Sequence, residues 1–160
     1  MGQKVLLNQM PIAIKDSKID ISSEETTKEL AKDLTHYLKG GEIVYLYGEM
    51  GVGKTTFVRY LINQFQKNKK LHITEVTSPT FNLLNEYDIN DLVIKHYDLF
   101  RLKDESEITN LDLFENNQNT ITLIEWPQLI SKNKSIKTID LIFSYENELN
   151  NRSVKIDGLN

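Results

Sequence analysis

The spacing of hydrophobic and polar residues along the chain predicts alternating strands and helices. Residues 42–47 and 120–125 are short, nearly continuous apolar runs, which are typical of buried strands. Over residues 24–38 and 54–67, apolar side chains recur at three- and four-residue spacing, which indicates amphipathic helices. The glycine pair at 40–41 is expected to end the first of these helices.

Elsewhere the pattern predicts hairpins and connections. In chain order these are one or two edge strands up to residue 21, a polar connection over 68–79 with one strand near 73–76, a hairpin of strands 81–88 and 92–98, a short helix within 103–117, and a final hairpin of strands 137–145 and 152–156. Helices between strands, flanked by hairpins, are typical of an α/β fold. We expect one domain over residues 1–160 with a central mixed β-sheet flanked by helices, in which residues 1–18 form an extension or edge strands.

Composition narrows the possible functions. A length of 160 residues, a net charge of −4 and 26% charged residues suit one globular domain and argue against a large basic nucleic-acid-binding domain. Because the chain has no cysteine, disulfides, thiol nucleophiles and cysteine zinc sites are excluded. No apolar run approaches the roughly 20 residues of a membrane span. The N-terminus lacks the apolar stretch of a signal peptide, so we expect a cytoplasmic protein without membrane contact.

A glycine-rich motif separates the first buried strand from the second helix. Residues 48–55 match G-x-x-x-x-G-K-[ST]. Glycines let backbone N–H groups approach phosphate oxygens, the lysine supplies positive charge, and the threonine hydroxyl suits Mg²⁺. With a strand before it and a helix after it, the motif predicts a P-loop NTPase domain. The residues expected to bind the nucleotide here are Glu49, Met50, Gly51, Val52, Gly53, Lys54, Thr55 and Thr56.

Two acidic residues stand at the ends of predicted strands, Asp98 and Glu125. In an open α/β sheet, functional residues lie at the carboxyl ends of the strands. Glu125 follows the more clearly buried strand, so we predict that it holds Mg²⁺ together with Thr55, directly or through water. Asp98 is predicted to orient the attacking water or a metal-bound water. In the alternative interpretation, one of the two acids is a strand-end residue that faces solvent.

The sequence favours ATP over GTP. Residues 133–136 begin like the guanine-reading motif N-K-x-D, but Ile136 stands where that motif requires aspartate. No arginine-rich lid is visible, which weakens the main alternative, a small-molecule kinase. A nucleotide-dependent binding module with little turnover is a second alternative.

Four stretches, one of which contains the phosphate motif, point to one family. The chain resembles the TsaE family, small bacterial ATPases of tRNA threonylcarbamoyladenosine synthesis, over roughly residues 22–152. The matching segments are YLYGEMGVGKTTFVR, SPTFNLLNEY, HYDLFRL and LIEWPQ, and the helix EETTKELAKDL also fits. The resemblance implies weak hydrolysis of ATP by the isolated protein. It also implies action on the heterodimer of the TsaD and TsaB families, which transfers threonylcarbamoyl to an adenosine beside the anticodon, with tRNA contacted only indirectly.

The resemblance also implies roles for individual residues. Lys54 contacts phosphate, Thr55 and Glu125 hold Mg²⁺, and Asp98 is needed for hydrolysis. Ser78, Pro79 and Thr80 form a switch-like loop near the γ-phosphate, in which Thr80 is our choice for the contact. The remaining residues expected near the nucleotide are Glu24, Trp126 and Arg152.

Simpler interpretations stand beside these roles. Residues 77–80 could be an ordinary turn, Trp126 could be a packing or partner-contact residue, and Arg152 could be merely solvated. The sequence predicts His96 to be a packed or exposed histidine and not a metal ligand.

Overall fold

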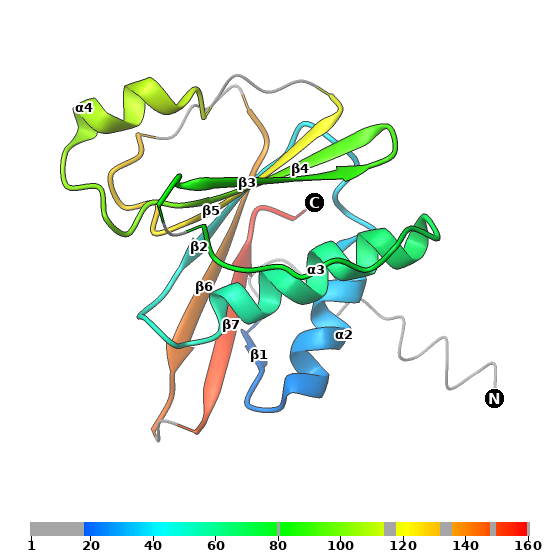
Figure 1. Cartoon of the computed structure of the whole chain (residues 1–160). Helices are drawn as coiled ribbons and strands as arrows, with labels where there is room; N and C mark the ends of the chain where they lie inside the picture. The colour runs from blue at the N-terminus through cyan, green and yellow to red at the C-terminus, as the bar shows by residue number, and fades with distance from the viewer. Residues whose placement is uncertain (1–17, 80, 114–117, 132–135, 148–149, 160) are drawn as a thin grey trace, which may run out of the picture.

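The computed structural model of the chain describes residues 18–79, 81–113, 118–131, 136–147 and 150–159 (Figure 1). Strands form a mixed seven-stranded sheet in the order β1-β7-β6-β2-β5-β4-β3. The predicted α/β fold with a central mixed sheet and flanking helices is therefore confirmed. The elements are β1 (Lys18–Asp20), α2 (Glu24–Leu34), β2 (Ile43–Tyr47), α3 (Lys54–Asn68), β3 (Leu84–Ile89), β4 (Leu92–Asp98), α4 (Glu105–Ile108), the 3₁₀ helix η1 (Thr109–Leu111), β5 (Thr120–Glu125), β6 (Thr138–Tyr145) and β7 (Arg152–Asp157).

The centre of the sheet is parallel and its edges are antiparallel. β2 pairs in parallel with β5 and β6, and β5 pairs in parallel with β4. The β3–β4 and β6–β7 hairpins, with β1 beside β7, add antiparallel strands at the two edges. The register sets Leu46 beside Glu125 and Glu125 beside Asp98. The carboxyl ends of β2, β5 and β4 therefore meet at one edge, the usual ligand-binding position in such sheets.

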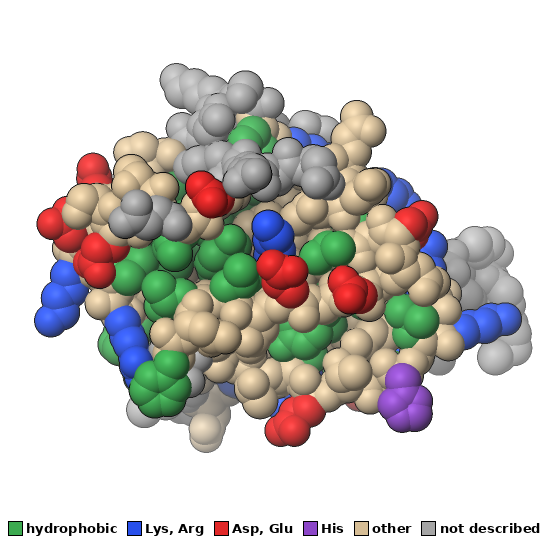
Figure 2. Space-filling model, turned by 45° about the horizontal axis from the view of Figure 1, so that its top comes forward, with side chains coloured by type: hydrophobic (Ala, Val, Ile, Leu, Met, Phe, Trp, Pro, Cys, Tyr) green, Lys and Arg blue, Asp and Glu red, His purple; other side chains and the backbone are tan. Residues whose placement is uncertain are grey.

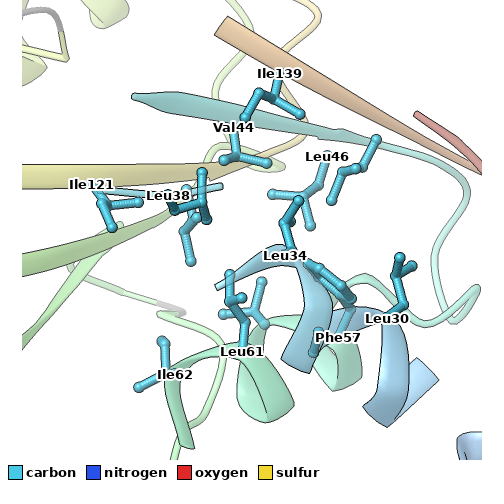
Figure 3. Packing of buried hydrophobic residues seen from close by; sticks show 14 of the residues in the cluster. Leu30, Leu34, Leu38, Val44, Leu46, Phe57, Leu61, Ile62, Ile121 and Ile139 are labelled. Atoms are coloured by element: carbon cyan, nitrogen blue, oxygen red, sulfur yellow. The ribbon is translucent and has the colours of Figure 1, made fainter. Parts of the chain in front are cut away.

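Each face of the sheet has its own hydrophobic core. Helices α2 and α3 lie together on one face (Figure 1). Their buried side chains point toward the strands in Figure 3, which labels Leu30, Leu34, Phe57, Leu61 and Ile62 on the helices and Val44, Leu46, Ile121 and Ile139 on the sheet. On the other face, α4 and η1 cover a smaller core around Tyr45, Tyr97 and Ile124. Because each fully buried large apolar side chain stabilises the fold by roughly 1.5–3 kcal/mol, the larger core fixes α3 and the loop before it against the sheet.

Helix α2 begins where the sequence predicts and ends earlier. Ser23 caps its N-terminus, since the Ser23 Oγ accepts a hydrogen bond from the backbone N–H of Glu25 at 3.1 Å. The predicted extension to residue 38 was wrong, because the helix ends at Leu34 with Thr35 as its C-cap. Leu38 is nevertheless buried in the core. The apolar spacing therefore marks buried residues, and it does not mark where the helix ends.

The predicted strand near residues 73–76 is absent from the structure, which describes residues 68–79 without a strand. Side chains of α3 bind this segment instead. The backbone N–H of Thr74 donates to Gln66 Oε1 at 3.2 Å, and Asn63 Nδ2 donates to the Thr74 carbonyl oxygen at 3.1 Å. Both backbone groups of Thr74 are satisfied by the helix, so the segment does not need a strand partner.

The remaining differences concern the limits of elements. β3 begins at Leu84 and not at residue 81, and the helix expected within 103–117 is the short α4 followed by η1. Residues 114–117 lie outside the described residues, as do residues 1–17. β1 pairs with β7 as an edge strand, as predicted for the end of the N-terminal segment. Within the described part of the chain, no helix is long and apolar enough to cross a membrane.

Candidate functional site

The phosphate motif forms a tight loop between β2 and α3. Its glycines at positions 48, 51 and 53 all have positive φ angles, of 148°, 80° and 118°. A Cβ atom on Gly48 would lie 2.9 Å from side-chain atoms of both Phe143 and Val52. Val52 is fully buried in the larger core, and its packing there holds the loop against the sheet. Glycine is therefore required where the loop leaves the strand, both for conformation and for space.

Lys54 is buried at the start of α3. Its Nζ donates a hydrogen bond to the Gly48 carbonyl oxygen and lies 3.5 Å from the centroid of the Trp126 ring, a cation–π contact. Burial lowers the pKa of Lys54 from its usual value, and the nearby Glu125 and Asp98 partly oppose that effect. A partly desolvated ammonium group in a loop of backbone N–H groups is well suited to bind an anion such as phosphate.

Glu125 ends β5 and connects two other side chains. Its side chain is 2% exposed. The Thr55 hydroxyl donates toward both carboxylate oxygens, at 3.1 Å to Oε1 and 3.0 Å to Oε2. The Nε2 atom of the fully buried His96 lies 2.7 Å from Glu125 Oε2. The predicted pair of Thr55 and Glu125 is thus in direct contact at the carboxyl edge of the sheet.

The donor set fits a magnesium ion. A hydroxyl and a carboxylate are hard oxygen ligands of the kind that Mg²⁺ prefers. The described residues contain no group of three or more His, Cys, Asp or Glu side chains that could hold a metal by itself. Because Mg²⁺ in nucleotide sites usually keeps waters and binds phosphate oxygens, one hydroxyl and one carboxylate are a sufficient protein contribution.

Asp98 ends β4 beside Glu125, and both of its oxygens have partners. The Ser78 hydroxyl donates to Oδ2 at 2.6 Å, and the Phe100 backbone N–H donates to Oδ1 at 3.0 Å. Asn85 Nδ2 on β3 donates to the carbonyl oxygen of Thr77 at 3.1 Å, so the residues next to Ser78 are hydrogen-bonded to β3. Ser78 and Asp98 are therefore brought together as a pair. Thr80, our predicted γ-phosphate contact, lies outside the described residues.

These side chains line one pocket of about 280 Å³. All of its lining residues belong to the set predicted from the sequence: Met50, Gly51, Gly53, Lys54, Thr55, Thr56, Ser78, Asp98, Glu125, Trp126 and Arg152. Arg152 starts β7, and its Nη2 donates to the Ser22 carbonyl oxygen at 3.4 Å. The tertiary structure thus gathers residues from the phosphate loop, α3 and three strand ends at one place.

Three other predicted nucleotide contacts do not line this pocket. Val52 faces the core and Glu49 is exposed. Glu24 accepts hydrogen bonds on the surface from Tyr60 Oη at 3.0 Å and from Arg59 Nη2 at 3.5 Å. Glu24 is therefore engaged with α3 and is not among the residues that line the pocket.

Sequence reasoning missed two features of the site. The first is His96, treated as a packed or exposed residue, whose contact with Glu125 is described above. Its spacing from Asp98 was the available signal, because alternate residues of a strand share a face. The second is the Phe100 ring, which is exposed and lies 4.9 Å from the Trp126 ring, centroid to centroid.

If the site hydrolyses ATP as the sequence predicts, replacing Asp98 by asparagine should lower that hydrolysis by about 100-fold or more while ATP binding persists. The amide keeps the size of the side chain and loses the negative charge that would orient water. Phosphate release and calorimetric titration with ATP measure the two effects. Asp88→Asn, at an exposed position on β3, is the matched control. Lost binding with normal turnover would instead indicate a structural acid.

A family model and several named proteins match most of this chain. The family model for "Threonylcarbamoyl adenosine biosynthesis protein TsaE" matches residues 21–154. Proteins named tRNA threonylcarbamoyladenosine biosynthesis protein TsaE are similar to this chain. One from Rickettsia conorii is 44% identical over 110 residues, 69% of this chain and 61% of that protein. One from Bacillus subtilis is 38% identical over 109 residues, 68% of this chain and 65% of that protein.

The extent of these matches differs between relatives. The aligned part spans 61% and 62% of the Rickettsia conorii and Rickettsia felis proteins, less than two thirds of either. The Nostoc relative, at 33% identity, is matched over 82% of this chain and 80% of its own length. The crystal structure of Bacillus subtilis YdiB superimposes with a TM-score of 0.64 at 22% identity, over 90% of this chain and 86% of that one. That structural likeness supports the fold.

Proposed function

The chain belongs to the TsaE family, and from this premise we propose that it is a Mg²⁺-dependent ATPase that supports threonylcarbamoyl modification of the adenosine next to the anticodon in tRNA. One observation carries the enzymatic part of the proposal. The phosphate loop, Lys54, Thr55 and Glu125 line one pocket, and Thr55 is hydrogen-bonded to Glu125. This is the arrangement that a nucleoside triphosphate with its metal requires.

Each residue has a part in the proposed hydrolysis. The loop N–H groups and Lys54 bind the phosphates and stabilise negative charge that develops on the γ-phosphoryl oxygens. Thr55 and Glu125 would hold Mg²⁺, which neutralises phosphate charge when bound. Asp98, kept in place by Ser78 and the Phe100 N–H, orients a water for in-line attack. Phosphate release without any added acceptor would separate this activity from a kinase.

Slow turnover by the isolated protein is part of the proposal. Two large apolar side chains at the site, Met50 and Phe100, are 63% and 53% exposed. Met50 lines the pocket, and Phe100 contacts Trp126. Exposed apolar side chains at a site often indicate a protein contact. We propose that the heterodimer of the TsaD and TsaB families is the partner and that its presence raises turnover.

The surface charge supports indirect contact with tRNA. On the face shown in Figure 2, basic side chains lie among acidic ones and form no broad basic area over the described residues drawn there. The net charge of the chain is −4. Because proteins that bind nucleic acid directly usually gather Lys and Arg on one surface, we propose that tRNA is bound mainly by the partner proteins.

The test is the modified nucleoside itself. In cells depleted of this protein, we expect threonylcarbamoyladenosine in tRNA to fall, as measured by mass spectrometry of tRNA nucleosides. Wild-type protein should restore it, and Lys54→Ala should not. An unchanged level on depletion would contradict the pathway role. Full rescue by Lys54→Ala would contradict the role of the nucleotide site.

A further inference from the structure

His96 occupies a buried position behind the predicted metal ligand. It lies in the middle of β4, on the face that carries Ile94 and the larger core, and its side chain is fully buried. Its Nε2 atom is 2.7 Å from Glu125 Oε2. Histidine is polar, and a buried polar side chain is costly unless it makes a hydrogen bond. Packing alone therefore does not explain this residue.

The contact defines which ring nitrogen carries the proton. An ionised carboxylate only accepts hydrogen bonds, so Nε2 must be the donor. The Nδ1 atom is buried and has no hydrogen-bond partner among the described residues. The contact is therefore a hydrogen bond from the Nε2–H group of His96 to Glu125 Oε2.

The two oxygens of Glu125 are held differently. Oε2 has two protein partners, the His96 ring and the Thr55 hydroxyl, whereas Thr55 is the hydrogen-bond partner of Oε1 in the described structure. If the Thr55 hydroxyl turns to a metal ion, His96 still binds Oε2, and Oε1 is the oxygen left to face the ion or its water. The histidine thus selects one orientation of the carboxylate.

We infer that His96 is a positioning residue, whose Nε2–H fixes the Glu125 carboxylate so that its other oxygen is presented to a divalent cation. The inference rests on the proposed function and deepens it. Groups that orient a metal ligand from behind typically change metal affinity by about 10- to 100-fold when they are removed.

The test compares nucleotide affinity with and without the metal. Calorimetry measures the affinity for ADP in Mg²⁺ and in EDTA, for wild type and His96→Leu. We expect Mg²⁺ to raise the affinity for ADP, and we expect this increase to be about tenfold smaller in the leucine variant than in wild type. Its affinity in EDTA should stay within about twofold of wild type, because Glu125 acts on the metal. His96→Gln, whose amide is long enough to donate in place of Nε2, should recover most of the gain.

Two controls keep the result interpretable. Tyr97→Phe, on the other face of β4, removes a hydrogen bond from Tyr97 Oη to the Leu111 carbonyl oxygen and should leave the Mg²⁺ gain intact. If His96→Leu does not fold, His96→Asn replaces it, since its shorter amide falls short of Glu125. Thermal unfolding identifies folded variants.

Three outcomes would overturn the inference. The first is a His96→Leu variant whose affinity for ADP rises with Mg²⁺ as much as that of wild type. The second is an equal loss of affinity with and without Mg²⁺, which would indicate a purely structural histidine. The third is a wild-type protein whose ADP affinity does not depend on Mg²⁺. That third result would also remove the proposed metal-dependent function, whereas the first two leave it standing.

Discussion

Replacing Lys54 by alanine is expected to weaken Mg-ATP binding by at least about 100-fold and to abolish measurable hydrolysis. The side chain is buried in the pocket, and in the described structure its Nζ contacts a carbonyl oxygen and an aromatic ring. Removing a desolvated charge that faces a phosphate costs several kcal/mol of binding free energy. Calorimetric titration with ATP and a phosphate-release assay measure the two effects.

The same substitution should not unfold the protein. Burial lowers the pKa of Lys54, which means that the folded environment disfavours its charged form in the absence of a ligand. We therefore expect Lys54→Ala to unfold in one cooperative thermal transition, as a folded protein does, although it no longer binds ATP. Lys28→Ala, at an exposed position on α2, is the matched control and should bind ATP as wild type does. Near-native affinity in Lys54→Ala would contradict the assignment of the phosphate loop.

Glu125→Gln is expected to have the second large effect, a fall in ATP turnover of about 100-fold or more. Glutamine has nearly the same shape and loses the charge that would hold Mg²⁺ with Thr55. Removing one preorganised electrostatic contact in an active site typically lowers the rate by about 10²–10³-fold. Phosphate release at saturating ATP, measured across a series of Mg²⁺ concentrations, tests this expectation.

The Mg²⁺ series distinguishes the proposed role of Glu125 from a structural one. If the carboxylate holds the metal, Glu125→Gln should need higher Mg²⁺ to reach its maximal rate, while its fold is retained. Glu86→Gln, an exposed acid on β3, should behave as wild type at every Mg²⁺ concentration. Unchanged hydrolysis by Glu125→Gln would exclude Glu125 from the metal site.

Local features of the site could be predicted because their signals lie within a few residues. The glycine spacing around Lys54 defines the phosphate loop, and the apolar run before Glu125 marks a buried strand. Parallel pairing then brings two such strand ends to the same edge as the loop. These local signals predict Lys54, Thr55, Asp98 and Glu125, whereas Ser78, Trp126 and Arg152 follow from the resemblance to the TsaE family. Their roles in binding and hydrolysis stay predictions.

Features that depend on competition between partners could not be predicted in the same way. The sequence predicts a strand near residues 73–76, but the side chains of Asn63 and Gln66 on α3 hydrogen-bond to the backbone groups of Thr74 instead. The contacts of Glu24 are set in the same way, because its carboxylate binds Tyr60 and Arg59 of α3, and its place near the nucleotide stays a prediction. In both cases the deciding partner lies on another element, at a position that periodicity does not reveal.

By itself, the sequence determined the alternation of elements, the phosphate loop and the acids that end β4 and β5, because these follow from side-chain periodicity, glycine conformation and strand ends. The tertiary structure alone decided that His96 lies against Glu125 and that the ring of Trp126 lies under Lys54. These contacts link strands distant in sequence, and their burial is set by how the sheet and its two cores pack.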